Sequence, residues 1–146
     1  MPREELTAYV LGGGGVLGSS EVGMVRALAE HGIRPDLVLG TSIGALNGAF
    51  IAADPGVEGA ERLAAVWEAV VREGVFLDNP MRQAARVAKY RTHLLSNAPL
   101  RHVIDRYLPV SRFDELEVAF QCVAACIEDS SGRWFTDGDL TDAVVA

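Results

Sequence analysis

Two glycine-rich turns near the start of the chain restrict what it can fold into. Residues 12–18 read GGGGVLG, and residues 40–44 read GTSIG. Each turn follows a short apolar run and precedes residues with helical spacing, which predicts two strand–turn–helix units. Successive units of this kind are typical of an α/β domain with a largely parallel sheet.

The rest of the chain continues this alternation. We expect strands near residues 7–11, 37–39, 118–127 and 133–136, and helices near residues 19–31, 43–52, 58–72, 99–107 and 140–145. The run at 37–39 is wholly apolar, as expected for a strand covered on both faces. Residues 73–98 are less regular and include a helix near 81–89. The last apolar helix begins at Leu140 and has room for about two turns, so we expect one domain over residues 1–146 that is incomplete at its C-terminus.

The composition excludes several classes of protein. A chain of 146 residues can bury one core, and a net charge of −7 without a basic stripe argues against nucleic acid as a partner. Cys122 and Cys126 share a predicted strand, so we expect buried free thiols and neither a disulfide nor a metal pair. We expect no cofactor. The sequence indicates no oligomeric state.

The N-terminus does not resemble a signal peptide, because charged residues and then glycines precede any long apolar run. The most apolar stretch, residues 37–53, is shorter than a bilayer span and is interrupted by polar residues. We therefore expect a cytoplasmic protein.

Ser42 is the candidate nucleophile. It lies between Gly40 and Gly44 in a G-x-S-x-G pattern, directly between an apolar strand and a small-residue helix. This is the context of a nucleophile elbow, the tight turn that presents a serine hydroxyl for attack. A serine that attacks a carbonyl also needs fixed donors for the oxyanion. The backbone N–H groups of the first turn, at Gly13, Gly14, Gly15 and Gly18, are candidates for that role.

The base that would activate the serine is not obvious from local patterns. His31 lies at the end of a predicted helix beside a glycine, and His93 and His102 lie in polar surroundings. Any of the three could belong to a catalytic triad, but no local pattern supports one, and such positions are typical of surface histidines. Asp137, in an Asp-Gly-Asp run, could be a catalytic aspartate, but the same run is ordinary turn and helix-cap chemistry.

The first turn also matches the G-x-G-x-x-G fingerprint of dinucleotide-binding domains. That fingerprint requires an acidic residue about 20 positions later, at the end of the second strand. Asp36 has the right spacing but precedes the strand. We therefore rank nucleotide binding below acyl chemistry and keep it as an alternative.

Taken together, these motifs resemble those of the patatin-like phospholipases, especially the small bacterial members. The resemblance lies in residues 10–18, in residues 35–45 (PDLVLGTSIGA) and in residues 134–140 (WFTDGDL). It implies a three-layer α/β/α fold and a serine–aspartate dyad without histidine. Ser42 would be the nucleophile and the first glycine turn the oxyanion hole. The substrate would be a lipid or acyl ester, with transient contact with a membrane surface.

The same resemblance assigns the catalytic aspartate to a later Asp-Gly motif, beyond Ala146. Asp137 then matches a family position that is not catalytic, and it stays only a weak candidate. Leu17 is a second departure, because the family often has Arg or Lys there. Two functions follow: a lipid acyl hydrolase of which this chain holds the nucleophile and oxyanion hole, or a non-catalytic domain that binds acyl or anionic ligands.

Overall fold

The computed structural model describes residues 5–72, 74, 98–126 and 128–146. Its elements are β1 (Ala8–Leu11), η1 (Gly15–Gly18), α1 (Ser19–Glu30), β2 (Leu37–Thr41), α2 (Ile43–Ala53), α3 (Val57–Arg72), α5 (Ala98–Tyr107), η2 (Phe113–Glu115), β3 (Ala119–Ala125), β4 (Gly132–Phe135) and α6 (Leu140–Val145). The helix expected near residues 81–89 lies outside the described residues. Every other expected strand and helix is present, with ends that differ by a few residues.

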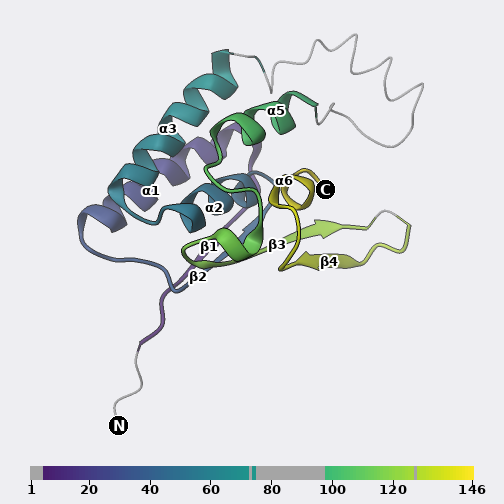
Figure 1. The fold of residues 1–146 in the computed structure, drawn as a ribbon, viewed down its shortest axis with the longest axis horizontal. Helices are drawn as coiled ribbons and strands as arrows, with labels where there is room; N and C mark the ends of the chain where they lie inside the picture. The colour runs from purple at the N-terminus through teal and green to yellow at the C-terminus, as the bar shows by residue number, and fades with distance from the viewer. Residues whose placement is uncertain (1–4, 73, 75–97, 127) are drawn as a thin grey trace.

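The sheet has the order β1-β2-β3-β4 (Figure 1). The first three strands are parallel, and β4 runs antiparallel to β3. The α/β class with a largely parallel sheet is therefore confirmed. Leu11 at the end of β1 pairs with Gly40 near the end of β2, so both glycine turns leave the same edge of the sheet.

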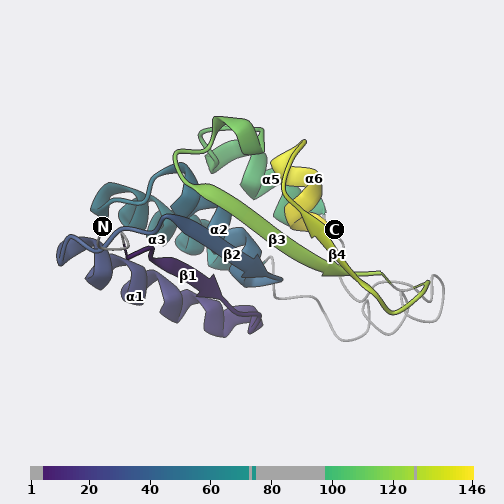
Figure 2. The same cartoon turned by 90° about the horizontal axis from the view of Figure 1, so that it is seen from below.

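The described helices cover one face of this sheet. Tyr9, Val38 and Phe120 point into the core and are almost fully buried, whereas Val10, between two buried neighbours on β1, is 73% exposed. Figure 2 shows the strands in front of α2 and α3. Leu37 and Leu39 are half-buried on the open face. The expectation that residues 37–39 are covered on both faces is therefore wrong for the part of the chain that the structure describes, which holds a single helical layer.

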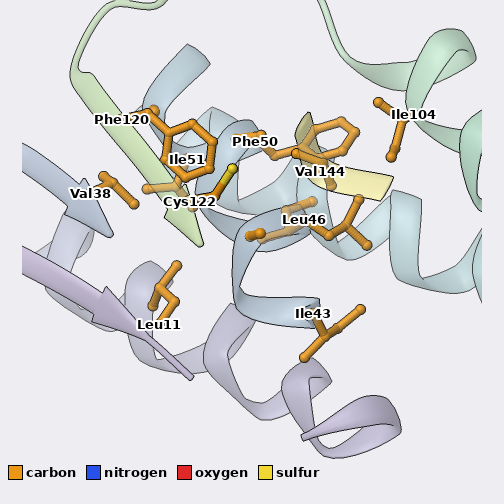
Figure 3. Packing of buried hydrophobic residues seen from close by; sticks show 14 of the residues in the cluster. Leu11, Val38, Ile43, Leu46, Phe50, Ile51, Ile104, Phe120, Cys122 and Val144 are labelled. Carbon is orange, nitrogen blue, oxygen red and sulfur yellow. The ribbon is translucent and has the colours of Figure 1, made fainter. Parts of the chain in front are cut away.

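Helix α2 lies at the centre of the core and packs against β1, β2, β3 and α3. Its residues from Ile43 to Ala52 are all buried. Figure 3 shows side chains of the sheet, such as Phe120 and Cys122, in one cluster with Ile51 and Leu46 of this helix. A Cβ atom on Gly48 would lie only 2.8 Å from Phe120, so the small residues of α2 allow the close packing that the sequence predicts.

The two cysteines are free, as expected. Cys122 is buried, but Cys126 is half-buried and its Sγ donates to Glu128 Oε2 at 3.1 Å. The expectation that both thiols are buried is wrong for Cys126, because it follows the last residue of β3, where the strand leaves the core.

Among the helices that the structure describes, none has both the length and the apolar character that a membrane span requires. The described residues also contain no cluster of three or more His, Cys, Asp or Glu side chains that could hold a metal ion.

Candidate active site

Ser42 follows β2 and is the N-cap of α2, with φ 53° and ψ −124°. Within the described chain, Ser42 and Ser130 are the non-glycine residues with positive φ. Such a conformation costs about 1–3 kcal/mol and persists only where surrounding packing enforces it. The turn exposes Ser42 while the next residue, Ile43, is buried. This is the strand–turn–helix geometry of a nucleophile elbow.

The glycines on either side of Ser42 are explained by close backbone contacts. A Cβ atom on Gly40 would lie 2.6 Å from the Cα of Ala45. One on Gly44 would collide with the carbonyl groups of Leu11 and Gly12. Any side chain at either position would push α2 away from the sheet, so the glycines fix the position of the serine relative to the first turn.

The first glycine turn lies against Ser42. A Cβ atom on Gly13 would be 3.3 Å from Ser42 Cβ and 3.9 Å from its Oγ. Gly15 has φ +56°, and a Cβ atom on Gly18 would lie 2.6 Å from Ile43 Cγ2. The loop from Gly13 to Gly18 therefore passes over the serine turn, and α1 begins directly after it. A helix N-terminus favours negative charge, as an oxyanion site requires.

A largely apolar cavity of about 530 Å³ opens beside Ser42. Leu46, Leu100, Val123 and Val144 are among its lining residues. None of the described residues that line it has a carboxylate or an imidazole in its side chain. The cavity could hold an acyl chain next to the serine hydroxyl, and its described lining offers no base.

Asp137 is not brought to Ser42. Phe135, the last residue of β4, pairs with Cys122, and Asp137 continues toward the amino end of β3. There the turn packs on the segment before β3, where Phe113 N donates to Gly138 O at 3.3 Å. Ser42, in contrast, follows the carboxyl end of β2. The two residues therefore lie toward opposite ends of the sheet.

Neither of the described histidines lines the cavity beside Ser42. His31 is at the C-terminal end of the 12-residue α1 and its Nδ1 contacts Ala27 O at 2.7 Å. Since α1 begins at the glycine loop, His31 lies about 18 Å along the helix axis from it. His102 is exposed on α5. His93 lies outside the described residues.

Asp36, the acidic residue of the nucleotide interpretation, accepts a hydrogen bond from Thr7 N at 2.7 Å. Thr7 precedes β1 and Asp36 precedes β2, so this contact is at the amino ends of the strands. The glycine loop is at their carboxyl ends. Asp36 therefore cannot reach the ribose of a nucleotide whose phosphates occupy that loop.

The cysteines are not rival nucleophiles. Burial raises the pKa of Cys122 to about 11. The pKa of Cys126 is also raised, first by its hydrogen bond to the Glu128 carboxylate. A thiol with a raised pKa holds less of the reactive thiolate at neutral pH.

Asn47 is the residue of this region that the sequence analysis did not single out. It is fully buried in α2 and its amide contacts both the glycine loop and α3. A polar residue in an otherwise apolar helix was the available signal. Its partners are 20 to 29 residues away in sequence, so the pattern alone could not identify them.

These features define an α/β protein in which a strained serine between a strand and a buried helix lies under a glycine loop. The family model of patatin-like phospholipase matches residues 9–146, and the chain belongs to that family. It is 32% identical over 133 residues to patatin-like phospholipase domain-containing protein 7 of Mus musculus, covering 91% of this chain and 9% of that protein.

Two further relatives support the same family. The chain is 30% identical over 137 residues to patatin-like phospholipase domain-containing protein 6 of Homo sapiens, covering 91% of this chain and 9% of the relative. A shorter match, 56% identical over 48 residues, is to lysophospholipase nte1 of Aspergillus terreus, with 33% of this chain and 3% of the relative covered. The chain thus spans less than a tenth of the length of these curated relatives.

Proposed function

We propose that this chain carries the nucleophile and the oxyanion hole of a serine acyl hydrolase that acts on lipid esters. The observation that carries the proposal is the backbone of Ser42, held at φ 53° directly under the Gly13 backbone. Strain of this kind clusters at functional sites. The apolar cavity beside Ser42 suits an acyl chain, and the relatives' names, phospholipase and lysophospholipase, indicate the substrate class.

In the proposed reaction, Ser42 Oγ attacks the ester carbonyl carbon while a carboxylate takes the hydroxyl proton. The negative charge that forms on the carbonyl oxygen is stabilised by backbone N–H groups of Gly13, Gly14, Gly15 and Gly18. Collapse of this intermediate breaks the ester C–O bond, and the carboxyl group passes its proton to the leaving oxygen, so that the neutral alcohol departs. Water then attacks the acyl–serine ester while the carboxylate takes its proton, and that proton returns to Ser42 Oγ as the free acid is released.

The carboxylate completes a proposed Ser–Asp dyad. Asp137 lies toward the opposite end of the sheet, and no acidic residue is among the described residues that line the cavity. We propose, from the family resemblance alone, that the aspartate belongs to a later Asp-Gly motif. Leu17, 74% exposed, leaves oxyanion stabilisation to the backbone. Lipid substrates also imply transient contact with a membrane or micelle surface.

This function is tested by measuring the release of fatty acid from lysophosphatidylcholine by the full-length gene product. The wild type is expected to release fatty acid, and Ser42→Ala is expected to lower kcat by at least about 10³-fold. Ser130→Ala is the matched control, since Ser130 also has positive φ (58°) but lies in the turn between β3 and β4. Turnover that survives Ser42→Ala would refute the assignment of the nucleophile.

One observation favours a second function. Because the described lining of the cavity lacks an acidic side chain, the chain could bind an acyl chain without hydrolysing its ester. Such a domain would bind a fluorescent fatty acid and show no Ser42-dependent release of acid from lysophosphatidylcholine. Ser42-dependent turnover would exclude it.

A further inference from the structure

Asn47 is the one polar side chain of α2, and its exposed fraction is 0%. The ten other residues of this helix are apolar or glycine. Burial of an amide is unfavourable unless its hydrogen bonds are all satisfied. A residue of this kind in the middle of a core helix therefore needs partners on several sides, and the structure supplies them.

The amide of Asn47 connects α2 to the glycine loop. Its Nδ2 donates to the carbonyl of Gly18 at 2.9 Å and to Glu21 Oε2 at 2.8 Å. The other oxygen of Glu21, Oε1, accepts from the backbone N–H of Gly12 at 3.1 Å. The two side chains thus hold the loop at both ends, Gly12 and Gly18.

The third contact fixes the orientation of the amide. Trp67 Nε1 of α3 donates to Asn47 Oδ1 at 3.0 Å. The oxygen therefore faces α3, while the NH2 group faces Gly18 of the loop and Glu21 in the first turn of α1. An amide fits this pattern of one acceptor and two donors, and glutamine would need room for one more methylene group at this fully buried position. Aspartate has the same shape, but its ionised carboxylate would face the Glu21 carboxylate and the Gly18 carbonyl.

We propose that Asn47 is a positioning residue for acyl transfer: with Glu21, it holds residues 12–18 against Ser42 through the helix that Ser42 itself caps. This inference rests on the proposed function, in which that loop stabilises the oxyanion. Serine and loop are thereby tied to one rigid element. Donors of an oxyanion hole act only when they are already in place as charge develops.

The direct test is to substitute Asn47→Asp in the full-length gene product and to measure kcat, KM and hydrogen exchange. The substitution removes both donors to the loop side and keeps the acceptor for Trp67. We expect kcat to fall about 10- to 100-fold, because a small displacement of a catalytic group has effects of this size. KM should change less than about threefold, since the interaction lost belongs to the transition state. Hydrogen exchange of the amides of residues 12–18 should become faster, with β2 unchanged.

Two further variants complete the experiment. Glu21→Gln breaks one of the two Glu21 contacts at a half-buried position, and it is expected to reproduce both effects if Asn47→Asp does not fold. Thr141→Val is the control. It removes one hydrogen bond of a buried residue, from Thr141 Oγ1 of α6 to Asp105 Oδ1 of α5 at 2.8 Å. Neither residue takes part in the contacts of Asn47 and Glu21 with the loop, so loop exchange should stay as in the wild type.

Loop hydrogen exchange and kcat together distinguish failure of this inference from failure of the proposed function. If loop exchange in Asn47→Asp and Glu21→Gln equals that of the wild type, Asn47 does not hold the loop and the inference is wrong. Faster exchange with unchanged kcat would also overturn it. If the wild type has no Ser42-dependent turnover, the proposed function fails. Loop exchange in Asn47→Asp still shows whether Asn47 positions the loop: faster exchange than in the wild type means that it does, and unchanged exchange means that it does not.

Discussion

At Ser42 the backbone adopts a positive-φ conformation that residues other than glycine rarely take. The close approach of its neighbours explains how this is enforced, because the turn is confined between β1, β2 and the first turn of α2. The glycines at 40 and 44 therefore have a packing role. In the proposed reaction their role is indirect and consists of holding the serine in place.

A pair of glycine substitutions tests the packing role of Gly44. Gly44→Ala would place a methyl group against the Leu11 and Gly12 carbonyls, and we expect it to lower the free energy of unfolding by about 2 kcal/mol or more. Gly23→Ala is the matched change at an exposed position of α1 with open space around the new Cβ. It should raise the free energy of unfolding by about 0.5–1 kcal/mol. Urea unfolding followed by circular dichroism measures both.

Equal effects of the two substitutions would mean that Gly44 is not packed as described. Local patterns were sufficient to predict the strand–turn–helix at Ser42, because such a turn is defined by consecutive residues. They could not find Asn47, Glu21 and Trp67, whose contacts join residues far apart in sequence.

The strands show the limit of prediction at the level of elements. Residues 37–39 are all apolar, so periodicity could not indicate that one face of β2 is open. On β1 the alternation is visible in the structure, with Tyr9 and Leu11 buried and Val10 exposed. The position of each residue relative to the helical layer decides its contribution to stability.

A Val→Thr substitution on the covered face of the sheet and another on its open face test how much each face contributes to stability. Val38→Thr would bury a hydroxyl at a position with an exposed fraction of 0%, and should destabilise the protein by about 1–3 kcal/mol. Val10→Thr, at 73% exposed, should change stability by less than about 0.5 kcal/mol. Both are measured by thermal unfolding. A comparable loss at Val10 would show that this face of the sheet is covered in solution.

For the molecule as a whole, strand order determines which motifs meet. Parallel pairing of β1 and β2 places both glycine turns at one edge, as two strand–turn–helix units predict. The reversal at β4 carries Asp137 away from that edge. The sequence could not establish this separation, because the direction of β4 relative to Ser42 depends on the pairing of β3 with β2.

The central claim is that Ser42, under the glycine loop, is the nucleophile. Its most direct test is labelling of the protein, as its gene encodes it, with a fluorophosphonate, followed by mass spectrometry of the peptides. We expect one adduct on Ser42, slowed by excess lysophosphatidylcholine and absent in Ser42→Ala. No adduct in the wild type, an adduct on another serine, or labelling that persists in Ser42→Ala would contradict the account.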